Sequence, residues 1–180
     1  MKKSNIVKLA AIAFAGVLSQ GAFAADGTIN FTGEITDNPC TLSPASQNMI
    51  VPLGNVSRNV FVNAGDKSPA ANFTIDLLQC SSSAVGAKVT FEGVQDTDRS
   101  DALAIANAGQ VGVTAATGVA VALSDSNGTP IPIGSLSDAF ILGVGTNSLR
   151  FKAAYVATKA NDLITTGPAN ATAQFTVTYN

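Results

Sequence analysis

The chain has 180 residues, of which ten are basic, twelve are acidic and none is histidine. A formal net charge of −2 over so few charges offers no basic patch for nucleic acid or for an anionic membrane. The sequence also lacks a nucleophile with a partner base, a glycine-rich phosphate loop and a cluster of metal ligands, so it indicates neither an enzyme nor a metal or cofactor site.

Residues 1–24 have the features of a secretory signal peptide. Three lysines precede an uncharged apolar run at residues 9–18, and Ala22-Phe23-Ala24 supplies small residues at a cleavage point. The apolar run is too short to span a bilayer. We therefore expect cleavage between Ala24 and Ala25, and an uncleaved interfacial anchor is the alternative.

The expected mature chain, residues 25–180, is one domain by its length. It keeps seven basic and twelve acidic residues, for a net charge of −5 over 156 residues. That length is enough for one hydrophobic core and short for two domains. Its many Thr, Val, Ala, Gly and Asn residues in short alternating runs predict an all-β sandwich.

The mature chain begins with an alternating stretch, residues 25–36. Its apolar face carries Ile29, Phe31, Gly33 and Ile35, and the opposite face carries polar residues. A period of two predicts a strand. This strand is either the first strand of its own domain, with Gly33 at a bulge, or one that pairs elsewhere, with Gly33 at a close approach of two backbones.

The chain contains two cysteines, Cys40 and Cys80. In an exported chain such a pair predicts a disulfide, because the periplasm and the exterior are oxidising. Closing a loop of this length is worth about 4 kcal/mol in the chain-entropy model. A metal site or a redox pair is the competing interpretation, and the wide separation and the absence of histidine count against both.

Four segments in the middle of the chain carry structural signals. Residues 48–54 predict a second strand that Gly54 ends, and the alternation of Phe73, Ile75 and Leu77 predicts a third. Residues 87–93 predict a fourth strand. Residues 102–108 predict one helical turn.

The acidic stretch from Asp96 to Asp101 raises the possibility of a calcium loop. It lacks the turn glycine and the terminal glutamate of an EF-hand loop. We therefore expect a solvated connection there.

Three further strands precede the last stretch of the chain. Residues 118–125 are followed by Asn127-Gly128 and by residues 129–134, which predicts a strand, a tight turn and a return strand with two prolines. The alternation of apolar residues at 149–155 with Arg150 and Lys152 predicts the next strand.

The last stretch predicts a strand with one apolar and one polar face. After Gly167-Pro168, the apolar face is formed by Ala169, Ala171, Ala173, Phe175, Val177 and Tyr179. We expect the second edge of this strand to require a partner from elsewhere. The small Ala171 and Ala173 either leave room for side chains of that partner or face bulky residues of the opposite sheet.

Both ends of the chain resemble chaperone–usher pilus subunits, the family of type 1 and P pilins. Gly167 is fourteenth from the end, Tyr179 is penultimate, and the N-terminal stretch reads Gly-x-Ile-x-Phe-x-Gly-x-Ile. The resemblance implies an incomplete immunoglobulin-like sandwich that lacks its final strand and is completed by donor-strand exchange. Residues 25–36 would be the donor strand and residues 169–179 the acceptor strand, and the disulfide would join the first strand to the third.

The resemblance also implies partners and a location. They are neighbouring pilus subunits, a periplasmic chaperone and an outer-membrane usher, with export through the periplasm to an adhesive surface fimbria. A chaperone is expected because an open strand edge beside apolar surface is an aggregation hazard.

The short N-terminal extension distinguishes this chain from rod-forming pilins. Only Ala25 and Asp26 precede Gly27, an arrangement that resembles linker or adaptor subunits. A secreted carbohydrate-binding module or minor tip adhesin is the alternative function, although the chain lacks tryptophan for stacking on sugars. A periplasmic β-sandwich enzyme is a third, which the missing histidine opposes.

Overall fold

The computed structural model describes residues 27–33, 35, 38–112 and 114–180, and the chain divides into two units, residues 1–36 and 37–180. In the first unit, the described residues have no regular secondary structure, and Ile29, Phe31 and Ile35 are exposed. The expected signal peptide, its cleavage point at Ala24 and Ala25, and Asp26, Glu34 and Thr36 of the expected donor strand lie outside the described residues.

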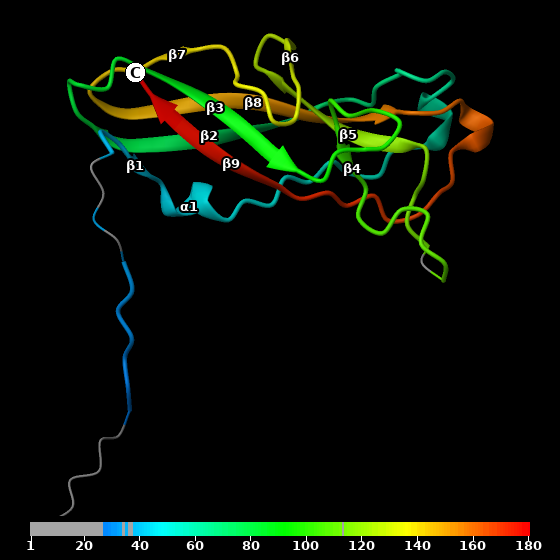
Figure 1. Ribbon diagram of the computed structural model, residues 1–180, viewed down its shortest axis with the longest axis horizontal. Coiled ribbons are helices and arrows are strands. Elements are labelled where there is room, and N and C mark those ends of the chain that lie inside the picture. The colour runs from blue at the N-terminus through cyan, green and yellow to red at the C-terminus, as the bar shows by residue number, and fades with distance from the viewer. Residues whose placement is uncertain (1–26, 34, 36–37, 113) are drawn as a thin grey trace, which may run out of the picture. The chain divides into compact units, whose positions relative to one another are not determined.

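The second unit is a sandwich of two antiparallel sheets (Figure 1). Its strands are β1 (Thr41–Leu42), β2 (Ala71–Cys80), β3 (Gly86–Gly93), β4 (Leu103–Ala104), β5 (Val119–Asp125), β6 (Pro130–Ile131), β7 (Phe140–Ile141), β8 (Gly145–Ala157) and β9 (Ala173–Tyr179). One sheet has the order β1-β2-β8-β5-β4, with β6 also paired to β5, and the other has the order β7-β3-β9. The helices described are the short α1 (Pro44–Gln47), η1 (Arg58–Val60) and η2 (Asn161–Leu163).

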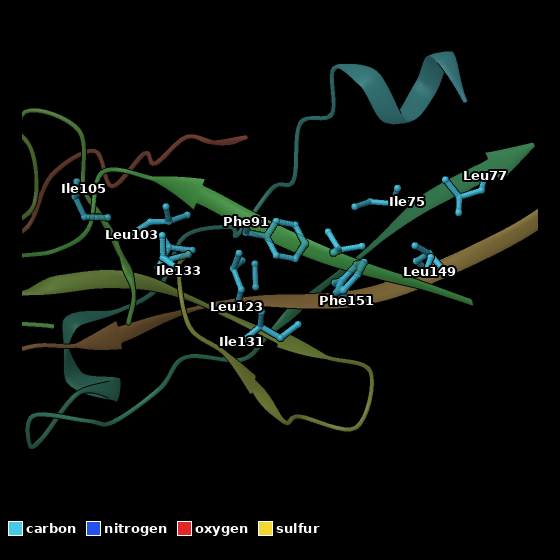
Figure 2. Packing of buried hydrophobic residues seen from close by; sticks show 14 of the residues in the cluster. Ile75, Leu77, Phe91, Leu103, Ile105, Leu123, Ile131, Ile133, Leu149 and Phe151 are labelled. Carbon is cyan, nitrogen blue, oxygen red and sulfur yellow. The ribbon is translucent and has the colours of Figure 1, made fainter. Parts of the chain in front are cut away.

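Phe151 of β8 joins the two sheets. Its ring stacks on Phe73 of β2 with centroids 5.5 Å apart, and it meets Phe91 of β3 edge to face at 5.1 Å. Phe140 of β7 is a third ring partner, at 5.2 Å. Figure 2 shows Phe91 of the three-stranded sheet and Phe151 among aliphatic side chains of the six-stranded sheet, such as Ile75, Leu123 and Leu149. Aromatic contacts of this geometry add to the free energy gained by burying the rings.

Most of the strands predicted from alternation are confirmed. The strands predicted around residues 73–77, 87–93, 118–125 and 149–155 are β2, β3, β5 and β8. The tight turn after β5 is also confirmed, and the Asp125 carboxylate accepts hydrogen bonds from the backbone N–H groups of Asn127 and Thr129.

Alternation did not predict that β8 becomes buried on both faces near its C-terminal end. There Ala154 and Val156 are buried as well as Ala153. Val156 packs with Ala102 and Ala120 in a second, smaller apolar cluster.

Two of the predicted elements are wrong. Residues 48–54 form no strand, because no described segment supplies a ladder of backbone partners for them; Met49 and Leu53 instead pack on the core from an irregular segment. Residues 102–108 do not begin with a helical turn, since Leu103 and Ala104 pair with β5 as β4. Burial of Leu103 in the core decided that conformation against local helical preference.

Candidate functional site

The last strand, β9, is held by one edge. It pairs with β3 from Ala87↔Tyr179 to Gly93↔Ala173. Within the part of the chain that the structure describes, no strand pairs with its other edge. The backbone groups on that edge therefore have no ladder partners, and such an edge is a template for the addition of another strand.

From Phe175 on, the side chains of β9 alternate as the sequence predicted, whereas Ala173, which was expected on the apolar face, is exposed. Phe175, Val177 and Tyr179 are half-buried and pack on the core, whereas the residues between them are exposed. The ring of Phe175 lies 6.4 Å from that of Phe91. An apolar face is therefore partly uncovered next to an unpaired backbone edge.

The strand β9 begins at Ala173, whereas the sequence predicted an acceptor strand that begins four residues earlier, at residue 169. The reason is that β3 ends at Gly93, opposite Ala173, so the ladder stops there. The preceding residues are held by other segments: Ala116 N donates to Pro168 O at 2.9 Å, and Ala106 N donates to Asn170 O at 2.8 Å. Ala169 and Ala171 still pack against the core.

Two open hollows are described, and the segment that leads into β9 lines the first of them. The first hollow, of about 380 Å³, is lined by residues 164–170, by residues 54–56 and by Arg58, Phe61 and Tyr155, among others. The second hollow, of about 340 Å³, is lined by Ala45, residues 48–52, Asn72 and Phe73. Residues 48–52 of the segment expected to form a strand thus line the second hollow, and residues 54–56 line the first.

Tyr155 fixes the segment that leads into β9. Its hydroxyl donates to Ala169 O at 2.8 Å, and its backbone N–H donates to Ser68 Oγ at 3.0 Å. Burial raises the pKa of the Tyr155 phenol, and burial likewise raises the pKa of Tyr179. The sequence predicted Tyr155 only as an inward residue of a strand, because the long-range bond to residue 169 leaves no local signal.

Gly167 lies where two backbones approach closely. A Cβ built there would collide with the carbonyl oxygen of Thr114 and would lie 3.0 Å from both Ala115 C and Ala116 N. Only glycine fits such a contact without movement of the chain. The sequence had identified Gly167 only by its place in a family pattern.

The disulfide between Cys40 and Cys80 is confirmed. It joins the residue before β1 to the last residue of β2, and these two strands pair with each other. The bond was expected to join the first strand to the third, but residues 48–54 form no strand between them, so β2 is the second strand of the chain. The expected donor residues Ile29, Phe31, Gly33 and Ile35 belong to the first unit. Their pairing with a β9 edge stays a prediction.

The carboxylates of the acidic stretch contact nearby backbone and basic groups, and Asp98 also forms an ion pair with the distant Lys159 at 3.3 Å. Asp96 accepts from the backbone N–H groups of Asp98 and Arg99, and Arg99 forms an ion pair with Asp101 at 3.0 Å. Among the described residues, no group of three or more acidic, cysteine or histidine side chains is arranged to hold a metal ion, and none of the helices has the length and hydropathy to cross a membrane.

Known proteins are similar to this chain along nearly its whole length. The family model described as "Fimbrial protein" matches residues 29–180. The "Probable major fimbrial subunit LpfA" of Escherichia coli O157:H7 is 39% identical over 98% of this chain and 97% of its own. The solved Burkholderia pseudomallei antigen and type I fimbria protein is 42% identical, with a TM-score of 0.60, over 85% of this chain and 97% of that one.

A solved chaperone–usher pilus subunit has the same fold. It is 25% identical with a TM-score of 0.67, over 87% of this chain and 96% of that one. The expected fold class, an all-β immunoglobulin-like sandwich, is therefore confirmed. Because the relative LpfA is named as a probable major subunit, the comparisons do not favour the alternative functions given above, namely an adaptor, a tip adhesin or a carbohydrate-binding module.

We expect Gly167→Ala to lower the free energy of unfolding by about 1–3 kcal/mol, because the added methyl group must displace the backbone at residues 114–116. Urea unfolding followed by circular dichroism measures the change. Gly143→Ala is the matched control, since a Cβ there would lie 4.0 Å from its nearest neighbour, Asn147 Oδ1. Equal stability of the two variants would contradict the close approach.

We expect the folded chain to lose stability at alkaline pH. Burial raises the pKa of both tyrosines of the chain, so the folded state favours the neutral phenol. This contribution is complete below the unfolded pKa of about 10 and is lost as pH rises through the folded pKa. Tyrosinate absorbance should therefore appear at higher pH in the folded chain than in urea, and less so in Tyr155→Phe. Identical titration curves in both conditions would contradict the expectation.

Proposed function

Because the chain belongs to the fimbrial protein family and is a structural subunit of a cell-surface fimbria, we propose that its copies polymerise by donor-strand complementation. The N-terminal segment of one copy adds to the free edge of β9 in the next. The single observation that carries this proposal is that β9 pairs with β3 alone in the described structure, beside an apolar face that is partly uncovered.

The parts of the chain have distinct roles in this proposal. Residues 1–24 direct export, residues 25–180 are the pilin domain, residues 25–36 are the donor strand, and residues 169–179 are the acceptor segment. A periplasmic chaperone covers the β9 edge during passage through the periplasm, and an outer-membrane usher receives the subunit. Exchange of a loosely fitting chaperone strand for a better-packed donor releases free energy, so assembly does not require ATP. The assembled fimbria contributes to cell adhesion.

The point where the donor segment leaves its own domain constrains the direction in which that segment can bind along β9 of the next copy. Residues 38–40 lie at one end of the sandwich with Asn180, because Ser81 N donates to Pro39 O and Val85 N donates to Asn180 O. We call this the root end. The opposite end, with residues 58–62 and 161–168, we call the far end. Asn38 comes three positions after Ile35 and can lie at most about 11 Å from it, so the root end of the donor copy lies next to the site that binds Ile35.

Only one direction allows the filament to continue. If Ile35 bound near Tyr179, the root end of the donor copy would meet the root end of the acceptor copy. Every inner copy is both a donor and an acceptor, so both of its neighbours would then have to occupy the same place at its root end. If Ile35 binds at the far end, each root end meets one far end, which is the head-to-tail contact that generates open filaments. The donor therefore runs antiparallel to β9, with Ile35 nearest the first hollow and with Phe31 and Ile29 toward the root end.

The donor residues suit the groove beside the free edge of β9, where apolar side chains are partly uncovered. Burying Ile29, Phe31 and Ile35 is worth roughly 5 to 9 kcal/mol, at about 1.5 to 3 kcal/mol for each side chain. Gly33 has no side chain and permits the backbones to approach closely between two of these anchors. The alternate polar residues of the donor then face away from the core.

A synthetic peptide tests the proposal. The full chain is given the substitutions Phe31→Asp and Ile35→Asp, so that it keeps its β9 edge but cannot act as a donor. A peptide of residues 25–36 at about 100 times its Kd should stabilise this chain by about 2.7 kcal/mol, which raises its Tm by roughly 5 to 10 °C. Differential scanning calorimetry measures the rise.

Two substituted peptides are matched controls. The Phe31→Asp peptide places its charge on the face that we expect to be buried and should have little effect on Tm. The Thr32→Asp peptide carries the same charge on the opposite face and should act like the unsubstituted peptide. An unchanged Tm with every peptide, or equal effects of the two substituted peptides, would overturn strand complementation by this segment.

A further inference from the structure

Building on the strand exchange proposed above, we propose that two exposed apolar patches at opposite ends of the sandwich bind each other in successive copies of the chain. The root patch consists of Val85, Ile141 and Val144. The far patch consists of Val60, Val62 and Leu163. The contact joins the folded domains directly and adds to the contact made by the donor strand.

The root patch lies near the place where the donor segment leaves the domain, because Ser81 N donates to Pro39 O and Cys80 pairs with Gly145. Its residues are exposed to 63%, 93% and 76% in the order Val85, Ile141 and Val144. Two loops carry them and are tied together, because Leu142 N donates to Val85 O at 3.1 Å and Gly86 pairs with Ile141. The second loop is also anchored at β2, where Gly145 pairs with Cys80. Figure 1 shows β7, β1 and the end of the chain gathered at this end of the sandwich.

The far patch lies beside the first hollow. Val60, Val62 and Leu163 are exposed to 42%, 64% and 59%. Asn161 holds their two segments together: its side-chain amide donates to Arg58 O at 2.9 Å and to Phe61 O at 2.7 Å, and its backbone N–H donates to Val62 O at 3.3 Å. Arg58, Phe61 and Ile164 of the same two segments line the hollow. The patch is therefore fixed before any partner arrives.

The donor strand brings the two patches together. When Ile35 lies at the first hollow, Asn38 of the same copy is within about 11 Å of it. The root patch of the donor copy then faces the rim of that hollow, where the far patch of the acceptor copy lies. The contact is heterologous, so it repeats along the filament without closing.

The charges at the two ends permit this contact. Residues 80–86 and 141–145, which carry the root patch, include no charged side chain. Residues 58–62 and 160–164 include one of each sign, Arg58 and Asp162. Docking therefore buries no excess of charge, and burial of an unpaired charge would be the main cost of such a contact. Exposed apolar residues that gather at one place on a subunit commonly mark an interaction site.

The test compares a whole copy with its donor peptide. The acceptor is the full chain with Phe31→Asp and Ile35→Asp, attached to a sensor surface. The ligands are the peptide of residues 25–36 and the full chain whose own groove has been filled with that peptide beforehand. We expect the full chain to dissociate at least about tenfold more slowly than the peptide, because the two patches add a second contact.

Substitutions in the patches separate this contact from the donor strand. Val62→Asp in the acceptor, or Ile141→Asp in the donor copy, should remove most of the tenfold advantage and leave peptide binding unchanged. Leu136→Asp in the acceptor is the matched control for Val62→Asp. Leu136 is an apolar residue of similar exposure, 56%, but it lies beside Thr90 in the middle of β3 and so away from both patches. Val62→Lys in the acceptor should restore slow dissociation to an Ile141→Asp donor, since the two new charges attract.

The outcomes distinguish the two proposals. Failure of the peptide to bind overturns strand complementation itself. Peptide binding with no advantage for the full chain, or with an advantage that Val62→Asp and Leu136→Asp reduce equally, overturns the contact between the patches and leaves strand complementation standing.

Discussion

The ladder between β3 and β9 is the constraint on which this structure depends. Seven residues of β9 pair with β3, and the described structure places no strand on the other side of β9. The apolar side chains of β9 still face the core, so the same residues that complete the sandwich on one side leave it open on the other. A strand that brings its own apolar residues satisfies the backbone edge and the uncovered side chains together.

The core stays ordered although one side of the sandwich is open. Phe151 contacts rings from β2, β3 and β7, and the disulfide ties the start of β1 to the end of β2. The segment before β9 is held separately, by the Tyr155 hydroxyl and by the close approach at Gly167. The acceptor edge is therefore presented by a rigid domain, which reduces the entropy that a binding strand must remove.

The sequence predicted those elements whose pattern is local. Alternation identified β2, β3, β5, β8 and β9, because in each of them apolar side chains on one face pack on the core along most of the strand. Residues 48–54 have the composition of a strand, but a strand also needs a neighbour, and no local pattern reveals that the described chain supplies none. The same limit applies to the site. The alternation of Phe175, Val177 and Tyr179 was readable, whereas the Tyr155 bond to Ala169 and the collision that forbids a side chain at Gly167 depend on distant residues.

Amide hydrogen exchange in β9 tests the central claim most directly. The measurement compares residues 173–179 in the monomeric chain carrying Phe31→Asp and Ile35→Asp with the same residues in assembled fimbriae. If a neighbouring copy adds a strand to the free edge, the alternate β9 amides that exchange fast in the monomer become strongly protected on assembly, and the amides of β3 that already pair with β9 change little. Equal exchange of the β9 amides in the two states would show that no strand joins this edge and would contradict the account.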